Sequence, residues 1–251
     1  MFDFKGVILK TFWWWNRIMQ VQHKRIIGMT AILMLLSAVL FYAIIYVMER
    51  PGGLSDRRMS RALELNSILH IPLGKTPDNA VEQFRGPSSM YVIHREPVRG
   101  GTLLFMKRPY QAGSHHLQVE YVRKTWIGWK WVWGGGYGIG ESSQSVTALN
   151  YMGLPELDSI STPFPMVFGD ILDPSIKKVN VKIRGEGSYN AKLTSAEAGR
   201  MIWFVFLPSP ASTPFDIEGY NEEGTLIARK TITDPRDSGS VHLEMDLKLI
   251  R

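Results

Sequence analysis

An apolar run of 23 residues near the N-terminus constrains this chain more than any other feature of its sequence. Residues 26–48 carry no charged side chain and lie between Lys24-Arg25 and Glu49-Arg50. As a helix with a rise of about 1.5 Å per residue, the run would be roughly 34 Å long, slightly more than the hydrocarbon thickness of a bilayer. A helix also satisfies its own backbone in lipid. The run therefore predicts one transmembrane helix, whereas a buried core helix would normally be shorter and have a polar side.

The flanks of this run indicate an uncleaved signal anchor and not a secretory signal peptide. The run ends Tyr46-Val-Met-Glu-Arg50, which lacks the small residues of a cleavage site. Five basic residues precede the run and four follow it closely, so charge favours a cytoplasmic N-terminus by a narrow margin. The roughly 200 residues that follow are long enough to be translocated largely regardless of charge. We expect a single-pass protein of the cell membrane with an extracytoplasmic C-terminal region.

The first 25 residues predict a cytoplasmic amphipathic segment that lies on the membrane surface. Apolar and aromatic side chains recur at helical spacing, and the lysines and arginines lie away from them. Indole rings prefer the headgroup region, and each basic side chain near anionic lipid contributes about 1 kcal/mol. A partly ordered tail is the alternative. The residues expected at the membrane interface are Phe12, Trp13, Trp14, Trp15, Lys24 and Arg25.

Charge is distributed unevenly along the chain, which argues against nucleic-acid binding. Residues 1–25 sum to +4, residues 51–150 to +5 and residues 151–251 to −3, within a net charge of +6. The predicted extracytoplasmic region is therefore nearly neutral and is not one uniformly basic domain. Cysteine is absent, which excludes disulfides, a thiolate metal site and a cysteine nucleophile.

Residues 51–140 predict a region of helix plus antiparallel sheet. Ser55 is a candidate N-cap for a helix that continues to about Leu69. Thr76-Pro77 starts a second, shorter helix, which Gly86-Pro87 ends. We expect the short helix to pack on an antiparallel meander. Its strand-like segments are residues 90–96, 102–108, 117–126 and 129–133.

Residues 166–251 predict an all-β, immunoglobulin-like sandwich. Seven short strand-like segments alternate there with turns rich in Gly, Pro, Asn and Asp. Residues 178–184 alternate between apolar and polar, as a half-exposed strand requires, and residues 200–207 are apolar on both faces and predict a central strand. Residues 141–165 are rich in Ser, Thr, Gly and Pro, and we expect them to form a linker between the two regions.

Several segments of the C-terminal part carry a family resemblance. They are Gly169-Asp-Ile-Leu-Asp-Pro-Ser-Ile176 leading into Val179-Asn-Val, then Arg200-Met-Ile-Trp203, and Gly219-Tyr-Asn-Glu-Glu-Gly224. In these the chain resembles uncharacterised single-span, membrane-anchored extracytoplasmic proteins of Gram-positive bacteria. No activity is known for that group, and the shared segments are turn and strand signals. The resemblance therefore implies a location outside the cytoplasm and no catalytic residue.

An aromatic segment between residues 126 and 137 is the part of the chain most open to a binding function. On a strand, Trp129, Trp131 and Trp133 would point to one face with indoles roughly 7 Å apart. With Tyr137 nearby, such a row could stack the sugar rings of a cell-wall glycan. The alternative is that the row is the core side of the meander, covered by the helix that starts at Pro77. Exposure of the indoles distinguishes these interpretations.

Other motifs give weaker signals. The glycine run at residues 134–140 lacks the strand-to-helix context of a phosphate-binding loop and predicts a mobile loop. His115-His116 has no partner at metal-ligand spacing, so a turn is expected there. We expect no metal, no cofactor and no catalytic site. Two acidic pairs could collect calcium, but their Asp-Pro steps favour turns: Asp170 with Asp173, and Asp234 with Asp237.

These features together predict a bitopic membrane protein, not an enzyme, whose extracytoplasmic region interacts with an envelope protein or senses a signal. The alternative is a cell-wall glycan-binding anchor that uses the aromatic row. A hydrolase with paired carboxylates is a third hypothesis, and it would need two acids facing one cleft. The expected partners are the lipid bilayer and an envelope protein or glycan, and nucleic acid is not expected.

Overall fold

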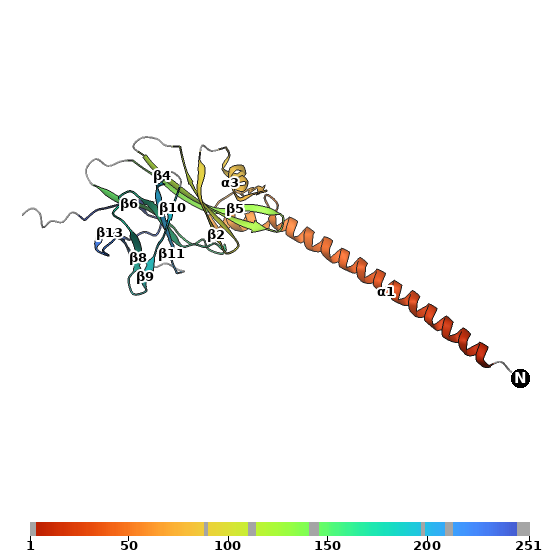
Figure 1. The fold of residues 1–251 in the computed structure, drawn as a ribbon. Helices are drawn as coiled ribbons and strands as arrows, with labels where there is room; N and C mark the ends of the chain where they lie inside the picture. Colours follow the sequence, from red (N-terminus) through yellow and green to blue (C-terminus); the bar gives the residue numbers. More distant parts are fainter. Residues whose placement is uncertain are drawn as a thin grey trace, which may run out of the picture. The chain divides into compact units, whose positions relative to one another are not determined.

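The computed structural model describes six stretches of the chain and divides it into two compact units (Figure 1). The units are Met1–Met48 and Glu49–Arg251. The first is helical, and the second is a mostly β body of antiparallel sheets. For residues 4–26 and Ser114 the backbone alone is described. The described residues are 4–87, 90–109, 114–140, 146–196, 199–208 and 213–244.

The first unit is a single continuous helix, α1 (Phe4–Glu49), whose last residue already belongs to the body. No proline interrupts it, and Pro51 follows its end. The Thr30 hydroxyl, inside the apolar run, donates to the carbonyl of Ile27 at 2.8 Å, so this polar group is satisfied within the helix. The backbone is helical through both the predicted surface segment and the predicted span.

Within the described residues, α1 is the one helix that is long and apolar enough to cross a membrane. Its large apolar side chains between Ile27 and Val47 are exposed, except that of Ile45, which is half-buried, and that of Leu40 is 63% exposed. A continuous apolar surface of this kind favours lipid over water.

The second unit opens with α2 (Leu54–Ala62), which is shorter than the predicted helix. Its N-cap is Gly53, not Ser55. It ends at Ala62, with Leu63 as its C-cap, because Glu64 adopts a positive φ of 53°, so the predicted continuation to Leu69 is wrong.

The next helix, α3 (Pro77–Arg85), begins and ends where the sequence predicts. The Thr76 hydroxyl accepts a hydrogen bond from the Asn79 N–H at 3.2 Å, and proline occupies the first turn. Gly86 follows with a φ of 80°, which glycine adopts without strain.

Sheet A has five strands in the order β1-β5-β4-β3-β2, and α3 packs on it (Figure 1). Strands β2 to β5 are neighbours in chain order, as predicted for a meander. The strands are β1 (Leu73–Gly74), β2 (Tyr91–Val98), β3 (Gly101–Lys107), β4 (Ser114–Thr125) and β5 (Gly128–Gly140).

The prediction of a mobile loop at residues 134–140 is wrong, because these residues form the second half of β5. They pair in register with residues 114–120 of β4. A Cβ atom at Gly136 would lie 2.7 Å from the carbonyl oxygen of Leu117, so the close approach of β4 requires glycine there. The glycine run reflects the packing of two strands.

Sheets B and C contain the remaining strands. Sheet B has the order β10-β11-β7-β6-β14, and sheet C has the order β13-β12-β8-β9. Strand β11 has neighbours on both sides, which confirms the central strand predicted at residues 200–207. The strands are β6 (Thr147–Leu154), β7 (Met166–Ile171), β8 (Lys178–Ile183), β9 (Gly187–Asn190), β10 (Lys192–Ser195), β11 (Met201–Phe206), β12 (Phe215–Tyr220), β13 (Leu226–Ile232) and β14 (Ser238–His242).

The predicted linker at residues 141–165 contains a strand, β6, which corrects that assignment. Ala148, Leu149 and Tyr151 of β6 are fully buried. The composition of the whole segment concealed this short apolar stretch, because the residues on either side of it are polar or proline-rich. Residues 141–145 lie outside the described part of the chain.

Two hydrophobic cores share sheet B. The first joins α3, sheet A and sheet B, and in it the ring of Phe105 lies 5.0 Å from that of Phe204 and 6.4 Å from that of Phe168. The second lies between sheets B and C, around Trp203 and Ile217. Because sheet B is covered on both faces, its inner strands are apolar on both faces.

Candidate functional site

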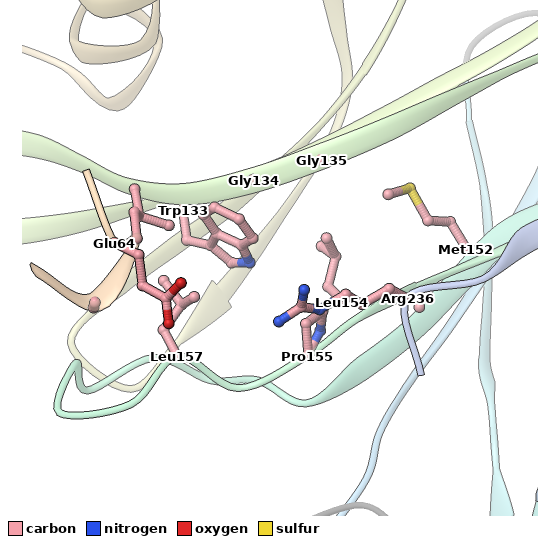
Figure 2. A pocket seen from close by; sticks show the side chains of 12 residues that line it. Glu64, Trp133, Gly134, Gly135, Met152, Leu154, Pro155, Leu157 and Arg236 are labelled. Carbon is pink, nitrogen blue, oxygen red and sulfur yellow. The ribbon is translucent and has the colours of Figure 1, made fainter. Parts of the chain in front are cut away.

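A pocket of about 450 Å³ lies where the end of α2, strand β5 and the end of strand β6 with the residues after it meet (Figure 2). Most of its lining is apolar, and it also contains one carboxylate, one guanidinium and one indole. Pockets of this size accommodate small ligands or single side-chain clusters of a partner. Its lining includes Glu64, Trp133, Gly135, Met152, Leu154 and Arg236.

Glu64 reaches the pocket because α2 ends in a Schellman turn. The Leu65 N–H donates to the Ser60 carbonyl at 2.9 Å, and the Glu64 N–H donates to the Arg61 carbonyl at 3.0 Å. This turn requires a positive φ at Glu64, where glycine is usual, and a larger side chain costs roughly 1–2 kcal/mol. The Glu64 and Trp133 side chains both line the pocket (Figure 2). Backbone strain retained at a ligand pocket is typical of functional sites.

Replacing Glu64 by glycine should raise the free energy of unfolding by about 1 kcal/mol, because glycine adopts positive φ without a Cβ clash. Glu64→Ala is the matched control, since it removes the carboxylate and keeps the strain. Denaturant unfolding of the full chain in detergent measures both. Equal changes in the two variants would show that the helix end is not strained.

A β-bulge in β5 turns Trp133 into the pocket. Tyr121 of β4 pairs with Trp133, while the next residue, Val122, pairs with Trp131, so Val132 is an extra residue in β5. Neighbouring residues of β4 face opposite sides of the sheet, and the two indoles therefore do so as well. The Nε1 atom of Trp133 is buried and has no hydrogen-bond partner among the described residues.

Arg236 is brought to the pocket by the turn between β13 and β14. The Asp234 carboxylate accepts a hydrogen bond from the Arg236 N–H at 2.8 Å, and the Gly153 N–H donates to the Asp237 carbonyl at 3.0 Å. A Cβ atom at Gly153 would collide with the carbonyl oxygen of Pro235, so glycine lets the turn lie against β6. These contacts agree with the turn predicted at Asp234 and Asp237.

Three polar groups of the pocket are left without partners in the described part of the chain. The Glu64 carboxylate and the Arg236 guanidinium form neither ion pairs nor side-chain hydrogen bonds there, and both residues are exposed. Trp133 Nε1 is a donor, the carboxylate an acceptor and the guanidinium a donor. The pocket therefore suits a largely apolar group that carries both hydrogen-bond donors and acceptors.

The predicted row of three indoles is wrong, because the bulge separates Trp133 from the others. Trp131 is 4% exposed and stacks on Phe84 of α3, with ring centroids 4.0 Å apart. This confirms the core interpretation for Trp131. Trp129 is half-buried, with the Lys124 ammonium 5.7 Å from its ring centroid. Glycan binding stays an untested prediction, but of the three indoles only Trp133 lines the pocket.

Tyr137, expected beside the same glycan, is instead buried in a polar network between sheets A and B. Its hydroxyl donates to Asp170 Oδ1 at 2.5 Å and accepts from the Asp170 N–H at 3.1 Å. Lys107 Nζ lies 3.4 Å from Asp170 Oδ2, and the His115 ring lies 3.7 Å from the same oxygen. The network joins β3, β4 and β5 to β7.

The network keeps a buried carboxylate ionised. Burial alone would raise the pKa of Asp170, but the neighbouring His115 ring, the Lys107 charge and the Tyr137 hydroxyl lower it to about 2. Burial lowers the pKa of Lys107, and the charge of Asp170 opposes that effect. Burial and the Asp170 charge raise the pKa of Tyr137 well above its usual value. We assign this network to holding the two sheets together.

Two of the three motifs considered for metal binding have other roles in the structure. The turn predicted at His115-His116 is wrong, because β4 begins at Ser114 and the two rings face opposite sides of the sheet. Asp170 pairs with Lys107, while Asp173 accepts from a backbone N–H within a turn. Among the described residues, no three His, Asp or Glu side chains could hold a metal ion together.

The residues expected at the membrane interface lie on the first part of α1. Their side chains lie outside the described part of the chain, so this assignment stays a prediction. They are Phe12, Trp13, Trp14, Trp15, Lys24 and Arg25.

Comparisons of this chain with protein-family models, with curated proteins and with solved structures found no match. The resemblance to membrane-anchored extracytoplasmic proteins therefore stays an expectation.

Sequence reasoning missed Glu64, Arg236 and Lys107 as site or network residues. No glycine marks the end of α2, so the positive φ at Glu64 leaves no signal in the sequence. Arg236 lies in an Asp-Pro-Arg-Asp turn that predicts only a change of direction. Lys107 at the end of a largely apolar strand is a hint of a buried ion pair.

Proposed function

We propose that this chain is a single-pass membrane protein whose β body lies outside the cytoplasm and binds an envelope protein partner, or senses it. Residues 26–48 would cross the bilayer with the N-terminus in the cytoplasm. The exposed apolar surface of α1 supports the span, and the charge flanks support the orientation. Sheets B and C, which share a core, would form the immunoglobulin-like sandwich.

The observation that carries the binding function is the pocket with three unpartnered polar groups. Met152 and Leu154 supply apolar walls, and Gly135 keeps the pocket open, because a Cβ there would lie 2.8 Å from the Leu154 side chain. A short peptide segment satisfies such a lining, with an apolar side chain inside and backbone donors and acceptors at the charged edge.

Site-specific photo-crosslinking in the source cell tests this function. A benzophenone side chain at Met152 should cross-link one envelope protein, whereas the same group at Glu223, in an exposed turn away from the pocket lining, should not. Combining Glu64→Ala with Arg236→Ala should remove most of the adduct. Absence of an adduct at Met152, or an adduct unaffected by the charge variants, would contradict peptide binding in this pocket.

A glycan is the second candidate ligand, because Trp133 presents an indole to the pocket. In the same experiment it would give an adduct that a cell-wall glycan hydrolase degrades. The hydrolase hypothesis gains nothing from this pocket, since Glu64 is the one carboxylate among the described residues that line it.

A further inference from the structure

The chain passes from the apolar run into the body without a linker. Glu49 accepts hydrogen bonds from Arg123 at 2.9 and 3.0 Å through its carboxylate, and from Lys130 Nζ at 2.7 Å through its carbonyl. Lys130 is 2% exposed and also pairs with Asp56 at 2.6 Å. The apolar run ends at Met48. If the run spans the bilayer, Glu49 lies at the headgroups, and its partners Arg123 and Lys130 lie near them.

The turn between β4 and β5 places an exposed tryptophan near this point. Arg123 pairs across the sheet with Lys130, and Trp126 lies three residues beyond Arg123, a distance of about 10 Å along a strand. Trp126 is 83% exposed, more than any other large apolar side chain described. The turn is held in shape, since the Thr125 hydroxyl donates to the Gly128 carbonyl at 2.8 Å. An indole fixed in this way suits the membrane interface.

The exposed side of α2 adds positive charge near Glu49, at the end of the apolar run. Asp56 and Met59 lie on the buried side of this helix, and Arg57, Arg58 and Arg61 are exposed. None of the three guanidinium groups forms an ion pair with a described residue. The sequence between Glu49 and α2 is four residues long, so these charges also stay near the end of the apolar run.

We propose that Trp126, Arg57, Arg58 and Arg61 form a basal face of the body, and that this face binds the surface of an anionic bilayer. Trp126 lies among the headgroups, and the arginines pair with lipid phosphates. The proposal rests on the span in the proposed function. It goes beyond that function because it assigns a second lipid contact, made by the folded body, which holds the body on the membrane.

The absence of cysteine makes a direct test practical, because one introduced cysteine can carry a bimane label. The full chain, carrying bimane at one of three introduced cysteines, is reconstituted in nanodiscs. The nanodiscs contain a nitroxide-labelled lipid as the quencher. Ile127→Cys reports on the turn while Trp126 stays in place, Leu40→Cys reports on the span, and Glu223→Cys is the remote control. Quenching is compared between phosphatidylglycerol-rich and pure phosphatidylcholine nanodiscs.

The label at residue 40 should be quenched in both lipids, and the label at residue 223 in neither. The label at residue 127 should be quenched at least threefold more in anionic than in zwitterionic nanodiscs. Reversing the charges with Arg57→Glu, Arg58→Glu and Arg61→Glu together should abolish that difference. An unchanged near-ultraviolet circular dichroism spectrum would show that the variant remains folded.

The outcomes separate this proposal from the proposed function. Quenching at residue 40 without quenching at residue 127 would overturn the basal face and leave the span intact. No quenching at residue 40 would overturn both. Equal quenching at residue 127 in the two lipids, or quenching unaffected by the charge reversals, would overturn binding to anionic lipid.

Discussion

Replacing Asp170 by asparagine should destabilise the body by about 3–5 kcal/mol, because a buried cation then loses its anion. Asp170 is 1% exposed, and its carboxylate faces both Lys107 and the Tyr137 hydroxyl. Asparagine preserves the shape and removes the charge. Denaturant unfolding of the full chain in detergent, followed by tryptophan fluorescence, measures the loss.

Asp158→Asn is the matched control, since Asp158 is exposed, and it should change stability by less than about 0.5 kcal/mol. A double variant with Lys107→Met and Asp170→Asn should recover part of the loss, because it leaves no unpaired charge in the core. A double variant as unstable as the sum of its parts would refute the ion pair as the cause.

The same carboxylate predicts an acid-sensitive stability. The folded-state pKa of Asp170, about 2, lies below its usual 3.8, so the ionised form favours folding. Its contribution of about 2 kcal/mol is fully present above pH 4 and is lost as the pH falls through 2. Asp170→Asn should flatten this part of the stability profile, although Asp216 and Glu96, whose pKa values are also lowered, keep some acid dependence.

Replacing Lys130 by methionine should cost about 3–5 kcal/mol at the other end of the body. Methionine fills a similar volume but leaves the Asp56 carboxylate, which is fully buried, without a cation. Asp56 would still accept from the N–H groups of Gly52 and Ile71, at 2.8 and 2.9 Å. We therefore expect the loss to appear first as faster hydrogen exchange in the segment from Glu49 to α2.

Lys124→Met is the control for this variant, because Lys124 is exposed and its ammonium only lies over the Trp129 ring. It should cost less than about 1 kcal/mol. If Lys130→Met is no more destabilising than Lys124→Met, the contacts of Lys130 with Asp56 and Glu49 do not anchor the start of the body.

The parts of this fold that were predictable are those encoded within a few neighbouring residues. The apolar helix follows from side chains at consecutive positions, and α3 follows from a cap at Thr76 and a stop at Gly86. Most strands follow from their short apolar segments. Each of these signals depends on local backbone sterics, local hydrogen bonds and hydrophobic periodicity, which the sequence displays directly.

Tertiary structure decided where those elements meet. The bulge at Val132 depends on the register with β4, and it alone sends Trp131 and Trp133 to opposite faces. The glycine run forms a strand because β4 approaches it closely. Asp170 pairs with Lys107 because sheet B packs on sheet A.

The pocket shows the same division. Glu64, Trp133 and Arg236 come from a helix end, a bulged strand and a turn far apart in the sequence. The sequence by itself determined the apolar helix and the strand-rich body, and its lack of cysteine excluded disulfides. Strand register and sheet packing decided the Asp170–Lys107 pair, and the contact of α2 with β5 decided the Lys130–Asp56 pair. Such contacts depend on distances between segments that no local pattern records.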